Sequence, residues 1–358
     1  MVKKKYKLKK EPLIRLITGL VVCIIVLSVC INYYNGRFER RLKKIGYTGV
    51  QINILKDHKV SLKTVSKYKY IEEIAGIVEN ENYQEKNLSK YLDKYVSKQD
   101  IDTVIYMVNN NLDYEYSDKL VNIIHEEYFI PNRLDRYMKY DKSTNSKDIV
   151  AAVNSNIDFD YYTNTNNTDV SKGKLMLVNK YYSLNNDYEC NDLVKVENMY
   201  ANLNDNKLNR EAYEALKELI VAADKEGYNI RINYSYRDYE TQEGIYNGYK
   251  ESKGEEYADN ISARPGFSEH QTGYAVDVGV QAKESTGKAF KNTGEYKWML
   301  ENSYKYGYIL RYPENKTNIT GYGFEAWHYR YVGKDVALYI HEHGITFDEY
   351  YAYFVENK

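Results

Sequence analysis

The sequence predicts an α+β fold for its C-terminal half, preceded by a mainly helical region and an N-terminal apolar helix. Residues 175–182 and 229–237 are rich in β-branched and aromatic residues that alternate with polar ones, which is typical of strands. Between them, residues 209–223 place apolar side chains on one face of a helix. Helices and strands do not alternate regularly, so an α+β arrangement is favoured over a parallel βαβ sheet.

Length and composition restrict the class of protein before any motif is considered. The chain has 358 residues, which is enough for about two domains. Hydrophobic residues make up 43% and charged residues 28%, so it is neither disordered nor a multi-span membrane protein. With 50 basic and 51 acidic residues the net charge is −1, which argues against a broadly basic nucleic-acid-binding surface. We therefore expect no nucleic-acid partner.

The near-neutral total conceals a charged N-terminus. Residues 1–15 hold seven bases and one acid, a net charge of +6, so the other 343 residues carry −7. Residues 16–31 (LITGLVVCIIVLSVCI) follow at once and contain no charge. Together with their flanks they predict a membrane anchor over residues 13–34, close to the length needed to cross a bilayer. Because Lys and Arg stay in the cytoplasm, residues 1–12 are expected inside the cell membrane and the rest outside.

Two other export signals remain open. A cleaved signal peptide would need a small-x-small site after the apolar run, and the sequence shows none. Residues 27–30 (LSVC) resemble a lipoprotein signal, but Val29 stands where that pattern requires Gly or Ala. All three interpretations export most of the chain. The exported part has Cys190 as its single cysteine, so it cannot form an internal disulfide.

Residues 35–150 are expected to form a helical stalk or docking region, and they contain a weak internal repeat. Residues 83–92 match residues 129–138 at a separation of 46, with aromatic and leucine positions in common. Two copies of a helical unit could bury one face against each other. Residues 151–172 are polar and rich in asparagine, so we expect a linker there, before a domain covering residues 173–358.

Two short segments combine histidine with carboxylates at spacings that suit a metal site. His270 and Asp277 flank a glycine-containing turn that leads into an apolar strand, and Glu325 and His328 stand three residues apart beside a tryptophan. His270, Asp277 and His328 would make an open zinc site with a fourth position for water. Glu325 would then be a spare carboxylate that can accept a proton from that water. On spacing alone, histidines with a purely structural role are the more common explanation.

The order of the motifs strengthens the prediction. The C-terminal half, from about Lys174, resembles the VanY-type D-alanyl-D-alanine carboxypeptidases of the LAS group of zinc metallopeptidases. The resemblance is carried by three segments in order: Tyr236-Arg237-x4-Gln242, residues 265–278 (PGFSEHQTGYAVDV) and residues 298–333, which contain the motif ExWH. It implies a small antiparallel sheet flanked by helices.

The resemblance also implies roles for individual residues. His270, Asp277 and His328 match the ligands of one Zn²⁺ ion per chain. Glu325 matches the catalytic base, and Arg237 matches the arginine that holds the substrate near the scissile carbonyl. Two further matches are expected to contact substrate: Ser268 and Gln242.

The predicted function is that of a membrane-anchored enzyme that removes the terminal D-Ala from peptidoglycan stem peptides in a Gram-positive-like envelope. One departure bears on the substrate: the family usually reads Ser-Gly-Tyr-Arg where this chain has Tyr234-Ser235-Tyr236-Arg237. An L,D-carboxypeptidase acting on tetrapeptides therefore stays open. A non-catalytic wall-binding module is a third interpretation, which the presence of Glu325 disfavours.

Overall fold

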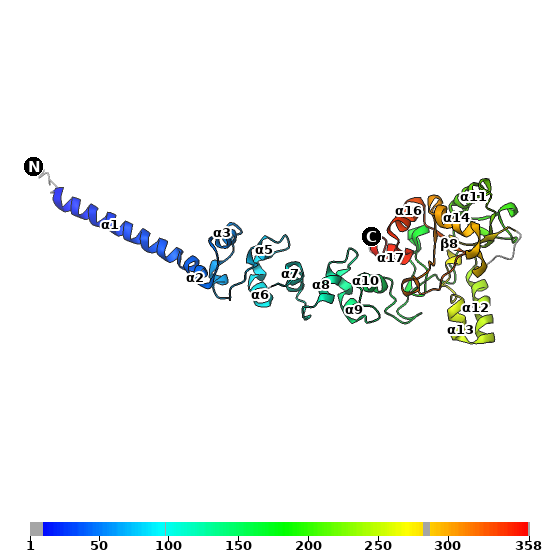
Figure 1. The fold of residues 1–358 in the computed structure, drawn as a ribbon, viewed down its shortest axis with the longest axis horizontal. Helices are drawn as coiled ribbons and strands as arrows, with labels where there is room; N and C mark the ends of the chain where they lie inside the picture. Colours follow the sequence, from blue (N-terminus) through cyan, green and yellow to red (C-terminus); the bar gives the residue numbers. More distant parts are fainter. Residues whose placement is uncertain (1–9, 97, 282–286, 357–358) are drawn as a thin grey trace, which may run out of the picture. The chain divides into compact units, whose positions relative to one another are not determined.

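The computed structural model describes residues 10–96, 98–281 and 287–356, and its contacts divide the chain into two compact units, one up to Ile124 and one from His125. Most of the predicted basic tail, residues 1–9, lies outside the described part. Figure 1 shows the elements in order along the chain. The first unit consists of helices: α1 Lys10–Asn35, α2 Arg37–Ile45, α3 Gly49–Asp57, α4 Leu62–Val65, α5 Ile74–Glu79, the 3₁₀ helix η1 Glu85–Asn87, α6 Leu88–Lys94, α7 Ile101–Asn109 and α8 Asp118–Ile124.

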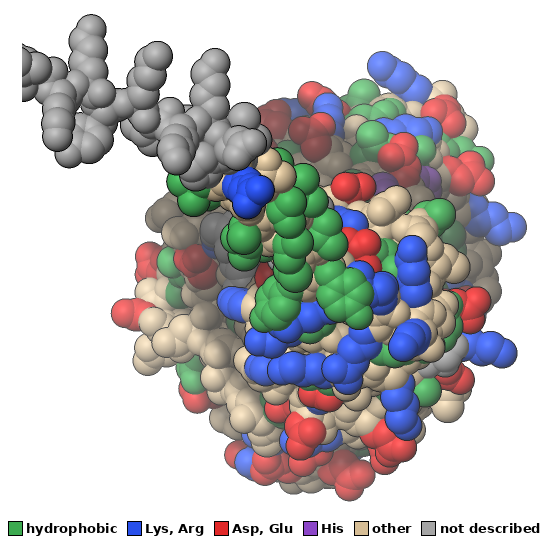
Figure 2. All heavy atoms as spheres, turned by 90° about the vertical axis from the view of Figure 1, so that its left-hand side faces the viewer, with side chains coloured by type: hydrophobic (Ala, Val, Ile, Leu, Met, Phe, Trp, Pro, Cys, Tyr) green, Lys and Arg blue, Asp and Glu red, His purple; other side chains and the backbone are tan. Residues whose placement is uncertain are grey.

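Helix α1 carries the apolar run of the sequence. Among its described side chains, Leu16 is 63% exposed and Ile24 is 60% exposed. Figure 2, viewed from the N-terminal end of the chain, shows hydrophobic side chains gathered on the surface of α1. Within the described residues, no helix is both long enough and apolar enough to cross a membrane.

The second unit contains both helices and strands. Its helices are α9 Leu134–Lys139, α10 Ser146–Asn154, α11 Arg210–Lys225, α12 Tyr239–Lys253, α13 Glu255–Ile261, α14 Gly294–Asn302, α15 Thr317–Thr320, α16 Lys334–His343 and α17 Phe347–Phe354. Its strands are β1 Asn166–Asn167, β2 Tyr182–Ser183, β3 Leu193–Lys195, β4 Lys207–Asn209, β5 Ile230–Tyr234, β6 Ala275–Val280, β7 Tyr308–Leu310 and β8 His328–Tyr331. Short 3₁₀ helices join them: η2 Pro131–Arg133, η3 Val170–Leu175, η4 Asn198–Tyr200, η5 Glu269–Thr272, η6 Gly287–Asn292 and η7 Ser303–Tyr306.

The central sheet confirms the predicted α+β class. Its four strands are antiparallel in the order β5-β6-β8-β7. Helix α11 packs on it, as its periodicity predicts: Leu216, Leu219 and Ile220 are fully buried, and the Asn209 side chain caps the helix by accepting the Glu211 N–H. Burying each such apolar side chain contributes about 1.5–3 kcal/mol to the free energy of folding. Helices α12 and α13 lie side by side and project from the side of the second unit opposite to α11 (Figure 1).

The internal repeat is visible as matching local contacts. Tyr91 in α6 and Tyr137 in α9 each accept a hydrogen bond, at 3.2 Å, from the backbone N–H seven residues earlier. Their hydroxyls donate, at 2.5 Å, to Asn109 in α7 and Asn154 in α10. The aromatic ring eight residues before each tyrosine packs against it, with ring centroids 5.7 and 5.8 Å apart. The sequence echo therefore corresponds to two copies of one helical unit.

The expected linker differs from what the structure contains. Ala151 and Val153 belong to α10 and are buried in the second unit, and residues 166–167 pair with β2. The boundary expected at residue 151 cuts through the apolar run at 149–153, which α10 buries. Strand structure is also shorter than predicted over residues 175–182, where β2 begins only at Tyr182.

Candidate active site

A short 3₁₀ helix and two neighbouring strands position the predicted metal ligands. His270 lies in the short 3₁₀ helix η5, which ends at Gly273 in the left-handed region (φ +75°). A Cβ at Gly273 would lie 2.4 Å from the Cys190 sulfur, so this turn requires glycine. Strand β6 follows and carries Asp277, whose backbone partner across the sheet is His328 in β8. Strand pairing therefore joins ligands that are 51 residues apart in the sequence.

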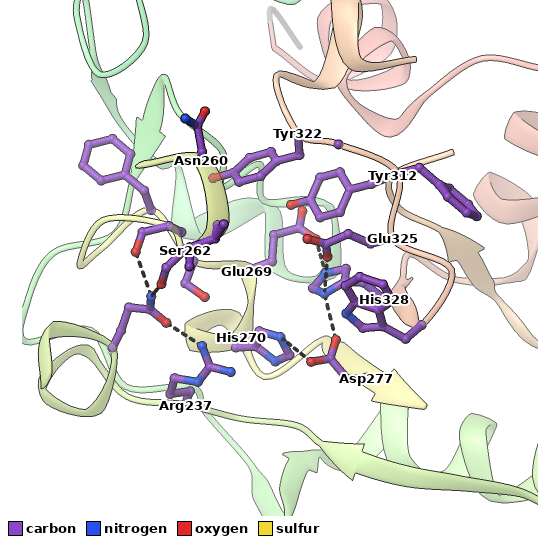
Figure 3. Close-up of a pocket in the computed structure, with 18 residues that line it drawn as sticks. Arg237, Asn260, Ser262, Glu269, His270, Asp277, Tyr312, Tyr322, Glu325 and His328 are labelled. Atoms are coloured by element: carbon purple, nitrogen blue, oxygen red, sulfur yellow. Dashed lines mark hydrogen bonds and ion pairs between the residues drawn. The ribbon is translucent and has the colours of Figure 1, made fainter. Parts of the chain in front are cut away.

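The three side chains converge on one point (Figure 3). His328 Nδ1 lies 3.0 Å from one Asp277 oxygen, and His270 Nε2 lies 3.5 Å from the other. One potential ligand atom from each residue lies within 4.8 Å of the other two. Two imidazoles and one carboxylate are a donor set that zinc accepts in catalytic sites.

Hydrogen bonds on the far side of each imidazole select the nitrogen that faces Asp277. His270 Nδ1 is 2.7 Å from the carbonyl oxygen of Ser235, so this nitrogen donates its proton and leaves Nε2 free. His328 Nε2 is 3.4 Å from a Glu269 oxygen, so its Nδ1 is the free nitrogen. The buried residues present therefore fit a metal ion. Burial opposes the charge of Asp277, yet the two histidines hold the pKa of its carboxyl well below the usual value.

Glu325 lies at the wall of the same cavity. Its carboxylate is 3.9 Å from His328 Nδ1, and its backbone N–H donates to the Tyr312 carbonyl. Burial, the largest influence, raises the pKa of Glu325 to about 7, although His328 acts in the opposite direction. A carboxylate with a pKa near neutrality can both accept and return a proton at physiological pH.

Arg237 reaches the cavity from the loop after β5. Its Nη1 donates to the Gln242 side chain at 2.7 Å, and Gln242 in turn donates to Ser262 and to the Ala263 carbonyl. Burial lowers the pKa of Arg237, and Asp277 opposes this shift most strongly. Gln242 is buried, and its side chain holds the guanidinium group of Arg237 in place. The predicted substrate contact Ser268 lies in the cavity wall.

All seven predicted site residues line one cavity of about 510 Å³. Other residues lining it were not predicted, among them Asn260, Tyr312, Tyr322 and Phe324. Tyr312, Tyr322 and Phe324 lie in the segment 298–333 that carries the family resemblance, but its motif ExWH does not include them, and Asn260 lies in α13.

The most informative residue that sequence reasoning missed is Glu269. Its side chain is fully buried, with one oxygen 2.8 Å from Arg311 Nε and 2.9 Å from Arg330 Nη1. Burial opposes its ionisation, but the two arginines hold the pKa of the carboxyl well below the usual range. The other oxygen faces His328, and Arg311 also binds Asp348 in α17. This buried ion network therefore holds the His328 ring on the side that faces away from Asp277.

Glu269→Gln is expected to weaken zinc binding about 10- to 100-fold, because the His328 ring would lose its charged partner. Competition with a chromophoric chelator measures the affinity directly. The control is Glu349→Gln, a buried glutamate in the capping box of α17 that does not line the cavity. Equal zinc affinities for Glu269→Gln and the unaltered chain would show that Glu269 has a structural role only.

Comparison with known proteins places the chain among peptidases. Residues 205–334, which include every predicted site residue, match the family VanY, D-alanyl-D-alanine carboxypeptidase. The chain is also 34% identical over 131 residues to the bifunctional D-Ala-D-Ala dipeptidase and D-Ala-D-Ala carboxypeptidase VanXYC of Enterococcus gallinarum, covering 36% of this chain and 69% of that protein. The chain belongs to the VanY family.

Other matches extend over about half of the chain. The putative carboxypeptidase YodJ of Bacillus subtilis is 41% identical over 188 residues, covering 49% of this chain and 66% of that protein. A solved structure of the LdcB LD-carboxypeptidase is 38% identical and covers 53% of this chain and 91% of that one, with a TM-score of 0.49. This VanY-family chain spans between about half and two thirds of the lengths of the first curated relatives.

Proposed function

We propose that this VanY-family protein is a zinc-dependent D-alanyl-D-alanine carboxypeptidase that removes the terminal D-Ala from peptidoglycan stem peptides. The observation that carries the proposal is the convergence of His270, Asp277 and His328 in one cavity with Glu325 and Arg237. A family match without these residues would indicate only the fold.

The residues of the cavity divide the chemistry between them. His270, Asp277 and His328 would hold Zn²⁺, which at such a site lowers the pKa of a bound water to about 7. Glu325 takes a proton from the attacking water and returns it to the leaving amine of D-Ala. Arg237 donates hydrogen bonds to the carbonyl oxygen of the scissile bond, on which negative charge develops.

The exported, membrane-anchored location is part of the proposal. It is supported by the uncharged run of residues 16–31 and by the seven bases before it. An anchored enzyme would meet its substrate next to the membrane. Recovery of the full chain in washed membranes instead of the soluble fraction checks this part of the proposal.

A peptide digest tests the activity and its metal dependence. The full chain in detergent is incubated with a pentapeptide stem and a tetrapeptide stem, with and without 1,10-phenanthroline. We expect release of one D-Ala from the pentapeptide, loss of release with the chelator and recovery on addition of Zn²⁺. Failure to release any residue, or release that the chelator leaves unchanged, would refute the proposal. Mass spectrometry that shows preferential cleavage of the tetrapeptide would assign the L,D activity instead.

A further inference from the structure

Charge is unevenly distributed within the first unit. Residues 36–70 hold ten bases and two acids, a net charge of +8, whereas residues 71–124 hold five bases and eleven acids, a net charge of −6. All ten bases of the first segment are exposed: Arg37, Arg40, Arg41, Lys43, Lys44, Lys56, Lys59, Lys63, Lys67 and Lys69. Lys56 pairs with Glu39 at 2.5 Å, and no ion pair within the described residues involves the other nine. Residues 36–70 therefore present a strongly positive surface.

Helix α2 gathers four of these bases on one side. Arg37, Arg40, Arg41 and Lys44 follow one another at intervals of three or four residues, which places them on one face of a helix. Leu42, on a different side of α2, is fully buried in the core of the first unit. The helix is therefore held by its apolar side, and its basic face is left exposed.

The basic face begins where the apolar helix α1 ends. Tyr33 and Tyr34, in the last turn of α1, are 70% and 59% exposed. The Arg37 guanidinium lies 3.7 Å from the centre of the Tyr34 ring, and that of Arg40 lies 4.1 Å from the centre of the Tyr33 ring. Figure 2 shows Lys and Arg side chains gathered next to the apolar side chains at this end of the chain. These contacts join the basic face to an exposed apolar helix through two tyrosines, a residue type that is enriched at membrane–water interfaces.

The topology expected for the chain gives the bases after α1 no role. Lys and Arg next to a membrane helix normally mark its cytoplasmic end, and residues 1–15 already hold seven bases for that purpose. The bases of α2 therefore need another explanation. Bases at the end of an inserted helix lie at the level of the lipid headgroups, where each Lys or Arg strengthens binding to an anionic surface by about fivefold.

We propose that the basic face of α2 binds the phosphate groups of anionic lipids on the membrane surface at which α1 ends. The inference rests on the anchored location that is part of the proposed function, and it adds a second contact with the membrane. A single helix leaves the first unit free to turn about the end of that helix. A second contact, through charge, holds the unit against the lipid surface.

Lysine labelling tests this contact on the full chain. The protein is reconstituted into nanodiscs of phosphatidylcholine or of an equal mixture of phosphatidylcholine and phosphatidylglycerol, acetylated briefly and analysed by mass spectrometry. We expect the acetylation rate of Lys44 to be at least about threefold lower in the anionic nanodiscs. Sodium chloride at about 1 M should abolish the difference, because it screens charges beyond about 3 Å. Lys225, an exposed lysine of α11, is the reference and should react equally in both lipids.

A charge-matched pair of variants identifies the face. Arg37→Gln/Arg41→Gln removes two charges of the basic face and should bring the labelling of Lys44 in anionic nanodiscs to within about twofold of that in neutral ones. Lys86→Gln/Lys297→Gln is the control, because it removes the same charge from two exposed positions outside residues 36–70. The control should keep the full protection of Lys44.

A soluble polyanion is the competing occupant of the basic face. Sodium polyphosphate is therefore added to the full chain in phosphatidylcholine nanodiscs, where no anionic lipid is present. We expect little protection of Lys44, because a soluble polymer is not held at the end of α1. Protection equal to that by phosphatidylglycerol would overturn the assignment to lipid.

The outcomes separate this inference from the proposed function. Equal labelling of Lys44 in neutral and anionic nanodiscs, or full protection in Arg37→Gln/Arg41→Gln, would overturn the lipid contact and leave the anchor standing. A full chain that enters neither kind of nanodisc would refute the anchored location, and the lipid contact with it. Release of D-Ala from the pentapeptide is measured separately and depends on neither result.

Discussion

Glu325→Gln is expected to lower the rate of D-Ala release by at least about 10³-fold while zinc stays bound. The substitution keeps the size of the side chain and removes its ability to accept a proton, and general base catalysis contributes about 10²–10⁴ in rate. Glu325 lies at the cavity wall, 3.9 Å from His328, and is not one of the three converging ligands. The metal site should therefore survive the change.

Two measurements on the purified full chain decide the role of Glu325. Single-turnover hydrolysis of the pentapeptide stem gives the chemical step, and metal analysis after dialysis gives the zinc content. Glu314→Gln is the control, because Glu314 is an exposed carboxylate paired with Lys291 and should have no effect. Substantial hydrolysis by zinc-loaded Glu325→Gln would exclude Glu325 as the base.

Arg311→Met is expected to destabilise the second unit by about 3–5 kcal/mol. Arg311 is fully buried and binds Glu269 at 2.8 Å and Asp348 at 2.5 Å. Removing the arginine leaves both carboxylates without this partner in a region from which water is excluded. A loss of this size lowers the melting temperature of a domain of this size by roughly 10 °C.

Tryptophan fluorescence reports on the relevant unit, because Trp298 and Trp327 are the only tryptophans of the chain and both lie after His125. Arg210→Met provides the comparison, since Arg210 forms an exposed ion pair with Asp192 and its loss should cost less than about 1 kcal/mol. A melting temperature for Arg311→Met within 2 °C of that of the unaltered chain would contradict the argument.

The ion network of Glu269, Arg311 and Arg330 shows why part of the site could not be predicted from the sequence. Arg311 and Arg330 are charged residues, which are rarely fully buried, and nothing in their local sequence marks them as core. Glu269 precedes a metal ligand directly, yet its side chain faces His328, 59 residues away. That contact depends on the pairing of β6 with β8, which local sequence does not specify.

The expected linker at residues 151–172 differs from the structure for a different reason. The polar composition of residues 151–172 indicated a linker, whereas residues 151–154 belong to α10 and residues 166–167 pair with β2 in the second unit. A few apolar residues suffice to bury a helix when a partner surface is present, and the average composition of a longer polar segment hides them. The repeat at residues 83–92 and 129–138 was a better guide, because it compares positions and not composition.

By itself, the sequence predicted the α+β class and helix 209–223 from side-chain periodicity, which is a local property, and it predicted His270, Asp277, His328, Glu325 and Arg237 from the resemblance of their motifs to the VanY family. Only the tertiary structure decided what surrounds these residues: the buried Glu269 network and the cavity residues Asn260 and Tyr312. Both arise from strand register and from helices packing over the sheet, which bring distant residues into contact. Long-range packing, not local pattern, sets these surroundings.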